Sequence, residues 1–192
     1  MKHLIIPILL LLILGCQPAQ KEQPGKPAAS ADHLTMATLW TQHAGEKQAL
    51  VYQTYKLAHL KLVKQLKKYQ GQLKPAIITD VDETVLDNSP YQAMLIKKGK
   101  SFAPETWAEW VNKEEAPALK GALPFFQAAD SAGVEVFYVT NRSDALKGAT
   151  IGNLKKHGFP YADSAHVYTK SSTSNKTARR KIIQKNHHIL LY

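Results

Sequence analysis

The sequence predicts an α/β fold, in which a parallel β-sheet is flanked by helices. Three short runs are rich in β-branched and other apolar residues, as buried parallel strands are: residues 76–78, 134–139 and 165–168. Helical patterns separate these runs, and a strand–helix–strand order favours parallel pairing. The chain has 192 residues, enough for one domain with its own core.

The first residues are typical of a secretory signal. A short basic start precedes the apolar run of residues 4–14, which is well below the roughly 20 residues of a bilayer span. The run ends at Cys16, the single cysteine of the chain, so no internal disulfide can form. Two interpretations remain open, an ordinary secretory signal with an incidental cysteine and a lipoprotein signal.

Residues 16–31 have the composition of a linker. They contain three prolines and no large apolar residue, so burial could not offset the entropy cost of ordering them. We therefore expect a signal peptide at 1–15, a linker at 16–31 and one domain at 32–192.

The domain is expected to begin with a mainly helical segment, residues 34–69, with a possible break at Gly45. Apolar residues recur there near helical spacing, and lysines lie on the other faces. The apolar positions are Leu50, Tyr55 or Thr54, Leu57, Leu62 and Leu66. Such a basic amphipathic helix can lie on a membrane, but we favour packing of its apolar stripe against the sheet.

The first strand leads into two carboxylates, Asp80 and Asp82, with Thr84 two positions further on. Open α/β sheets bind ligands at the carboxyl ends of their strands. Two like charges there are unfavourable unless a cation binds, and Mg²⁺ is the usual oxygen-seeking choice. The pattern therefore indicates phosphoryl transfer, with one carboxylate as nucleophile and the other as acid and base. A chance acidic surface loop is the alternative.

Between the first two strands we expect an insertion in the place of a cap over the site. Residues 90–92 and 97–102 are interpreted as loop, and Pro104 is suited to the first turn of a short helix. Four aromatic residues of this region could stack on a substrate ring or could simply be core: Tyr91, Phe102, Trp107 and Trp110.

The second half of the chain continues the alternation. A helix over 121–132 is expected to end at Gly133, and the strand that follows delivers Thr140 and Asn141. A further helix is expected over 143–156, with a stop at His157-Gly158.

The segment after the third strand offers a candidate cation for the site. Ser174 can cap a helix, which would place Lys176 in its first turn. A cation there opposes the helix dipole, so the position suggests use rather than stability. Lys170 is the competitor, and we prefer Lys176. His187 and His188 are interpreted as surface residues.

The run from Asp80 to Ser89 resembles the first motif of the haloacid dehalogenase superfamily. More narrowly, it resembles the class C bacterial acid phosphatases, whose lipoprotein members sit on outer membranes. The resemblance implies a haloacid dehalogenase-like, Rossmann-like sheet with a small cap. It also implies Mg²⁺-dependent hydrolysis of phosphomonoesters at acidic pH, with nucleoside monophosphates and aryl phosphates as equally suitable substrates.

The resemblance also implies a role for each candidate residue. Asp80 would attack phosphorus to form an aspartyl-phosphate, and Asp82 would protonate the leaving group and then activate water. Thr140, Asn141 and Lys176 would hold the phosphoryl oxygens. Mg²⁺ would be bound by the Asp80 carboxylate, the backbone carbonyl of Asp82 and waters.

The residues around Cys16 resemble a bacterial lipobox, which implies cleavage before Cys16 and acylation there, with palmitate among the lipids. Gln17 resembles the outer-membrane sorting pattern. The expected partners are thus a small phosphorylated substrate and the membrane, through the lipid anchor.

Residues 189–192 resemble the start of the fourth strand of the family. In class C acid phosphatases that strand runs into a Gly-Asp-Asn-Leu-x-Asp-Phe motif with further Mg²⁺ ligands, which is absent here. The expectation is a C-terminally incomplete member with marginal stability, weak Mg²⁺ binding and low turnover.

The alternative function is a catalytically silent, truncated lipoprotein that at most binds phosphorylated ligands or polyanions. The net charge of +10 would suit polyanions. Because the basic residues are spread along the chain, we interpret them as a solvated surface and expect no nucleic-acid partner.

Overall fold

A parallel sheet of four strands forms the centre of the described part of the protein. The computed structural model describes residues 31–192, so the predictions for the signal peptide, Cys16 and nearly all of the linker lie outside it. The strand order is β3-β2-β1-β4, and every neighbouring pair is parallel. The strands are β1 (Lys74–Thr79), β2 (Glu135–Ser143), β3 (Val167–Lys170) and β4 (His187–Leu191). The predicted α/β class is confirmed.

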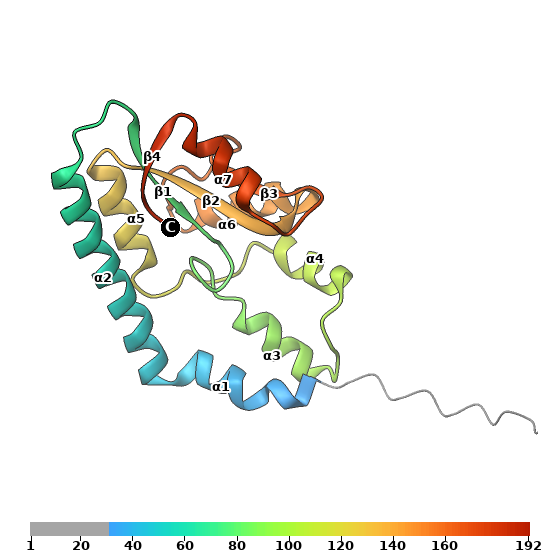
Figure 1. Cartoon of the computed structure of the whole chain (residues 1–192). Helices are drawn as coiled ribbons and strands as arrows, with labels where there is room; N and C mark the ends of the chain where they lie inside the picture. Colours follow the sequence, from blue (N-terminus) through green and yellow to red (C-terminus); the bar gives the residue numbers. More distant parts are fainter. Residues whose placement is uncertain (1–30) are drawn as a thin grey trace, which may run out of the picture.

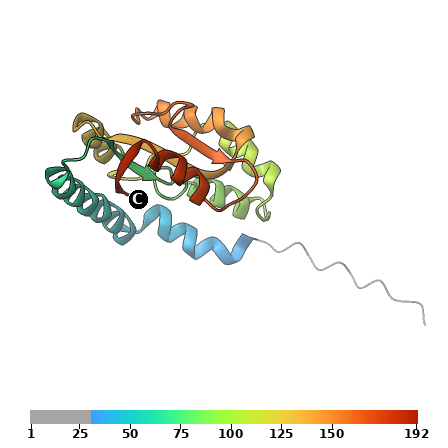
Figure 2. The same ribbon diagram turned by 45° about the horizontal axis from the view of Figure 1, so that its top comes forward.

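Helices surround this sheet and account for most of the remaining chain (Figure 1). The α-helices are α1 (Thr35–His43), α2 (Gly45–Lys68), α3 (Ser89–Lys97), α4 (Pro104–Asn112), α5 (Ala122–Ser131), α6 (Lys147–Lys156) and α7 (Thr177–Gln184). Two 3₁₀ turns, η1 (Ala31–Leu34) and η2 (Asp144–Leu146), precede α1 and α6. In Figure 2, α7 (red) lies in front of the strands, and α2 (teal) lies along the left edge of the molecule.

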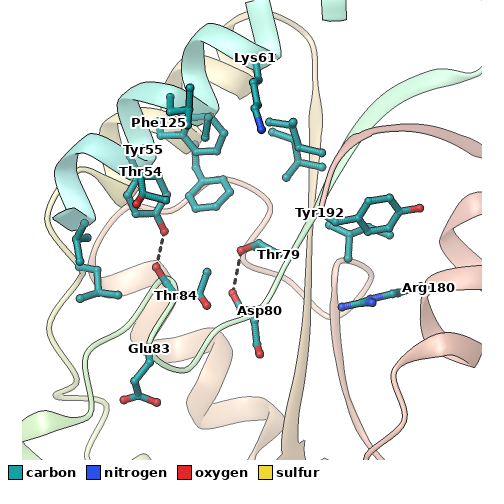
Figure 3. Close-up of a pocket in the computed structure, with 18 of the residues that line it drawn as sticks. Thr54, Tyr55, Lys61, Thr79, Asp80, Glu83, Thr84, Phe125, Arg180 and Tyr192 are labelled. Atoms are coloured by element: carbon teal, nitrogen blue, oxygen red, sulfur yellow. Dashed lines mark hydrogen bonds between the residues drawn. The ribbon is translucent and has the colours of Figure 1, made fainter.

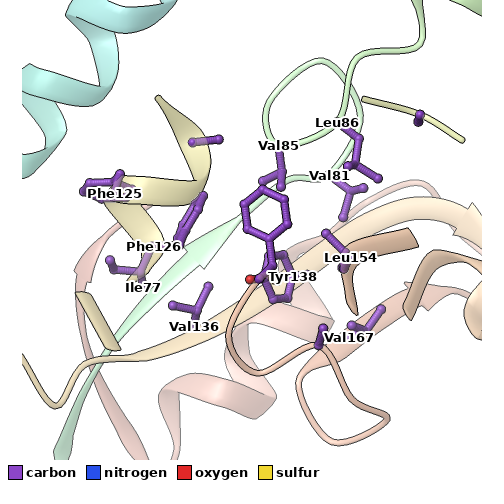
Figure 4. Packing of buried hydrophobic residues seen from close by; sticks show 14 of the residues in the cluster. Ile77, Val81, Val85, Leu86, Phe125, Phe126, Val136, Tyr138, Leu154 and Val167 are labelled. Atoms are coloured by element: carbon purple, nitrogen blue, oxygen red, sulfur yellow. The ribbon is translucent and has the colours of Figure 1, made fainter. Parts of the chain in front are cut away.

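Side chains that alternate along the strands divide the interior into two layers. Val136 and Tyr138 of β2 belong to the larger layer, which includes side chains from α2, α5 and α6 (Figure 4). Phe137 and Val139 belong to the smaller layer, where Ile183 of α7 packs. Because successive side chains of a strand point to opposite faces, β2 needs apolar residues at nearly every position.

The N-terminal helical segment breaks at Ala44, whose extended backbone (φ −71°, ψ 125°) separates α1 from α2, next to the predicted Gly45. The stripe of α2 that meets the core includes Tyr55, Leu62 and Leu66. Leu50 and Leu57, also predicted in that stripe, are 55% and 52% exposed. The prediction was wrong for these two because, at 3.6 residues per turn, their positions fall on a different face of α2 from Tyr55, Leu62 and Leu66.

The predicted packing of α2 against the core is therefore confirmed for Tyr55, Leu62 and Leu66. Across residues 31–192, no helix combines the length and the apolar character needed to cross a bilayer.

The segment after the first motif differs from the prediction. Residues 90–92, expected as loop, lie in α3, while the chain from Lys98 to Ala103 is loop. Pro90 is in the first turn of α3, where its missing N–H costs nothing. Tyr91 and Leu95, one helical turn apart, are both buried, and this burial favours the helix.

Of the two histidines that begin β4, His188 is exposed as predicted, whereas His187 is not a surface residue. The His187 side chain is 16% exposed, and its Nε2 lies 2.9 Å from Glu135 Oε2. His188 is exposed, and its ring stacks on Tyr69 with centroids 4.4 Å apart. The prediction failed for His187 because Glu135 is brought beside it only by the sheet.

Candidate active site

In the loop after β1, buried apolar residues hold the backbone while the carboxylates remain accessible. Val81, Val85 and Leu86 are fully buried. The Val81 carbonyl accepts hydrogen bonds from the N–H groups of Val85 (2.8 Å) and Leu86 (2.9 Å), which closes the loop tightly. The side chains of Asp80 and Asp82 are 41% and 24% exposed. Anchoring by apolar residues thus leaves two carboxylates at the carboxyl end of β1.

Lys176 forms an ion pair with Asp80, with 2.5 Å between Nζ and Oδ2. The other oxygen, Oδ1, accepts the N–H of Val81 at 2.8 Å. The Lys176 side chain is only 13% exposed, whereas that of Asp80 is 41% exposed, so water reaches this pair from the carboxylate side. Lys170, the competitor, lies in β3, where it is paired with Ser143 of β2.

Lys176 lies immediately before α7 and not in its first turn as predicted. Ser174 makes no cap; instead, Asn175 Oδ1 accepts the N–H of Thr177 at 2.8 Å. An asparagine side chain readily bonds the backbone two residues further on, and this turn starts the helix later than expected.

Thr140 and Asn141 lie within β2, because the strand extends to Ser143 beyond its predicted end. Thr140 is buried, and its hydroxyl donates to Asp82 Oδ2 at 3.1 Å. Asn141 is exposed, and its Oδ1 accepts a hydrogen bond of 2.8 Å from Arg179. The site therefore gathers Asp80, Asp82, Thr140 and Lys176 closely, with Asn141 at its rim.

Arg179 is a site residue that the sequence interpretation missed. Besides Asn141, its guanidinium contacts the backbone carbonyl of Thr140 and, at 3.4 Å, that of Thr173. It follows Lys176 by three positions, a spacing that puts two side chains on the same side of a helix. That spacing was the available signal.

Arg142 and Asn88 were also missed, and both contact Asp82. Arg142 donates from Nε (2.9 Å) and Nη2 (2.8 Å) to Asp82 Oδ1, and Asn88 Nδ2 donates to the same oxygen at 2.9 Å. An arginine that directly follows Thr140-Asn141 at the end of a buried strand was a usable signal, because a buried cation needs an anionic partner.

The aromatic residues of the insertion mostly support the core and not an open pocket. Tyr91 and Trp110 are buried, which agrees with the core alternative. Trp107 is half-buried, and the Arg142 guanidinium carbon lies 5.5 Å from its ring centroid. Phe102 is 63% exposed.

A cavity of about 600 Å³ opens beside Asp80, between α2, α5 and the end of β4 (Figure 3). Its lining includes Tyr55, Lys61, Thr84, Arg180 and Tyr192. The Tyr55 hydroxyl donates to the Thr84 carbonyl and so ties α2 to the loop after β1. Burial raises the pKa of Tyr55 far above its usual value, so this hydroxyl stays a donor.

Glu83 also belongs to the loop, and its backbone adopts φ +55°, a left-handed conformation that is uncommon for a residue with a side chain. Burial raises the pKa of Glu83, although hydrogen bonds from Asn88 oppose that rise. Its Oε1 accepts the Asn88 N–H at 3.0 Å, next to the start of α3. This contact offers a reason why the strained turn persists.

The donor atoms suit a weakly held Mg²⁺. The Asp80 carboxylate accepts two contacts, so lone pairs remain on a group that offers about four. With the Asp82 carbonyl this makes two oxygen ligands, and Mg²⁺ commonly keeps several waters beside one or two carboxylates. No cluster of three or more His, Cys, Asp or Glu residues within residues 31–192 could hold a metal.

Comparison with known proteins places this geometry in a family. The model of the haloacid dehalogenase (HAD) superfamily, subfamily IIIB (acid phosphatase), matches residues 20–192. Two solved structures of the class C acid phosphatase from Bacillus anthracis, one with tungstate bound, superpose with a TM-score of 0.79 at 44% identity. The match covers 83% of this chain and 67% and 66% of those chains.

Curated relatives are more distant. The chain is 31% identical to the stem 28 kDa glycoprotein of Glycine max over 124 residues, which are 61% of this chain and 49% of that protein. It is 32% identical to acid phosphatase 1 of Solanum lycopersicum over 108 residues, 54% of this chain and 42% of that protein.

The chain thus spans about two thirds of the solved relatives and less than half of these curated ones. The family match nevertheless extends over nearly the whole sequence, and the fold agrees with that of the solved class C acid phosphatase. The chain belongs to the haloacid dehalogenase superfamily, in its acid phosphatase subfamily IIIB.

Proposed function

We propose that this protein hydrolyses phosphomonoesters through an aspartyl-phosphate intermediate. The observation that carries the proposal is the pairing of Asp80 with the largely buried Lys176 side chain at 2.5 Å, beside Asp82 at the carboxyl end of β1. A lysine so close to a carboxylate can also receive the charge of a phosphoryl group that approaches it.

In the proposed first step, Asp80 attacks phosphorus and the bond to the leaving oxygen breaks. Asp82 gives its proton to that oxygen, so the leaving group departs as a neutral alcohol. Lys176, Thr140 and Asn141 hold the phosphoryl oxygens. In the second step, Asp82 takes a proton from water, the water oxygen bonds to phosphorus, and the bond to Asp80 breaks to release phosphate.

Mg²⁺, held by the Asp80 carboxylate and the Asp82 carbonyl, would neutralise charge on the phosphoryl oxygens when bound. We propose nucleoside monophosphates or aryl phosphates as the phosphomonoester substrates. The cavity of about 600 Å³ beside Asp80 is of the size that small-molecule sites have, and Lys47 and Lys61 line it.

The test is Mg²⁺-dependent release of phosphate from these two substrate classes at acidic pH. Asp80→Asn should abolish turnover, because an amide is a poor nucleophile, whereas Asp130→Asn, at an exposed position of α5, should keep it. A wild type that matches Asp80→Asn would favour the catalytically silent alternative, and phosphate binding without release would then identify it as a binding protein.

We also propose that Cys16 carries a lipid anchor that places the protein at the outer membrane. The lipobox-like context of this single cysteine supports the proposal. Cys16→Ser should release the protein from membranes or block its processing, and radiolabelled palmitate that stays on Cys16→Ser would refute it.

A further inference from the structure

A buried polar cluster surrounds Asp82 on the side away from solvent. The Arg142 side chain is 1% exposed. Within residues 31–192, its one ion pair is with Asp82. Asn88 is 2% exposed, and its Oδ1 accepts the indole N–H of Trp110 at 2.9 Å. Because burial of polar groups is costly unless they are paired, this arrangement invites a functional explanation.

The two carboxylate oxygens of Asp82 accept different numbers of hydrogen bonds. Oδ1 accepts three hydrogen bonds, two from Arg142 and one from Asn88. Oδ2 accepts one, from the Thr140 hydroxyl at 3.1 Å. An arginine fork usually spans both oxygens of a carboxylate, but here both of its donors meet one oxygen. Since a carboxylate oxygen has two lone pairs, Oδ1 is saturated and Oδ2 is not.

We propose that Arg142 and Asn88 are positioning residues that fix Asp82 through Oδ1, so that Oδ2 faces the leaving group and carries the transferred proton. The inference rests on the proposed function and deepens it. In the balanced step, the O–H bond at Oδ2 breaks as the alcohol O–H bond forms, while the bond from Asp80 to phosphorus replaces that of the leaving oxygen.

Thr140 fits the same scheme. Its Oγ1 donates to Oδ2 and accepts the N–H of Arg142 at 3.1 Å. A hydroxyl has one proton, so it cannot donate to Oδ2 and to a phosphoryl oxygen together. When Thr140 turns its proton to a bound phosphoryl group, the remaining partner of Oδ2 is withdrawn, while Oδ1 stays held.

Two tryptophans of helix α4 contact the residues that hold Asp82. Trp107 contacts the Arg142 guanidinium, and Trp110 orients Asn88. Arg142 Nη1 reaches the Thr150 hydroxyl at 3.4 Å, which adds a contact from α6. The insertion therefore acts on the position of the acid, through two aromatic residues that do not line the cavity beside Asp80.

The experiment measures kcat/KM for a series of phosphomonoesters whose leaving groups range from p-nitrophenol to a simple alkyl alcohol. This parameter reports the steps up to departure of the leaving group. A poor leaving group needs the proton and a good one does not, so Arg142→Lys and Asn88→Ala should lose far more with the alkyl ester. We expect a loss of about 10²-fold or more with the alkyl ester, within the usual worth of proton transfer, and a much smaller one with p-nitrophenyl phosphate.

Asn153→Ala is the matched control. Asn153 is also a buried asparagine, but it bonds the backbone of Ala116 and lies outside the site. Its loss should lower thermal stability and leave the dependence on the leaving group as in wild type. A merely structural role for Asn88 would give the same pattern as this control and would overturn the inference.

If Arg142→Lys does not fold, Trp110→Phe removes the indole N–H that orients Asn88 and keeps a smaller aromatic ring in its place. It should show the same leaving-group dependence with a smaller amplitude, and a wild-type dependence would overturn the inference. A wild-type chain without turnover would refute the proposed function, and this inference with it, whereas an active wild type with variants that lose all substrates equally would refute this inference alone.

Discussion

At the scale of single residues, Asp80 and Asp82 depend both on a sequence neighbour and on side chains from remote segments of the chain. Val81 separates Asp80 and Asp82 and is itself fully buried, so the motif alone directs both carboxylates outward. Lys176 and Arg142 come from remote segments and hold one carboxylate each. The two lysines proposed for the charge at Asp80 can now be distinguished by experiment.

We expect Lys176→Met to reduce phosphatase turnover by about 10²-fold or more, as loss of a group that stabilises transition-state charge does elsewhere. Lys170→Met is the matched control. It should change turnover little, because Lys170 lies in β3, where it is paired with Ser143 of β2. Steady-state rates at saturating substrate compare the two. Equal losses would show that the 2.5 Å ion pair has no special role.

At the scale of elements, α7 has two tasks. Its start places Lys176 and Arg179 at the carboxyl end of the sheet, and its Ile183 packs in the smaller core layer with Ile78 and Phe137. Ile182, next to it, is 52% exposed. Burial of one isoleucine thus determines how the helix that carries the cations lies on the sheet.

Ile183→Ala should lower the free energy of unfolding by about 2–5 kcal/mol, the usual cost of truncating a buried isoleucine. Ile182→Ala should cost far less, because its side chain is already half in water. Denaturant unfolding of both variants gives the comparison. A similar cost for both would mean that α7 does not pack on the sheet as described.

At the scale of the whole molecule, the two ends of the sheet have different chemistry. The carboxyl ends hold the site, whereas the amino ends meet at Glu135. Its carboxylate lies 2.9 Å from Lys74 Nζ of β1 and 2.9 Å from His187 Nε2 of β4, and 3.7 Å from His166 Nε2 ahead of β3. This cluster joins all four strands.

Burial acts to raise the pKa of Glu135, but hydrogen bonds from Lys74 and His187 outweigh it, and the pKa lies below its ordinary value. A carboxyl with a lowered pKa stabilises the fold above the ordinary value, near 4.5, and loses that contribution as the pH falls through the folded-state pKa. Acidification should therefore weaken the wild type at this cluster.

Glu135→Gln should be less stable than wild type near neutral pH, and the difference should shrink as the pH falls below the ordinary glutamate value. Thermal unfolding across that range measures it, with the exposed Glu109→Gln as control. A difference that stays constant with pH would rule out a contribution from ionised Glu135.

The sequence alone determined the first two strands, the end of α5 and the first carboxylates. β-Branched residues in 76–78 and 134–139 select strands because their side chains fit a pleated, buried surface. Gly133 ends α5 with φ +75°, a conformation that glycine adopts freely. Asp80 and Asp82 could be chosen from the sequence because their spacing and the preceding strand are local features.

The resemblance already implied that Thr140 and Lys176 belong to the site. Only the tertiary structure showed that Arg142 and Asn88 contact Asp82. Arg142 reaches Asp82 from 60 positions away, His187 reaches Glu135 from 52, and Arg179 reaches Asn141 from 38. Nothing local in any of these residues specifies its partner, since the pairing follows from strand order and from how α7 lies on the sheet. Composition and spacing describe one segment at a time, and it is packing of the sheet and its helices that brings distant charges within hydrogen-bonding distance.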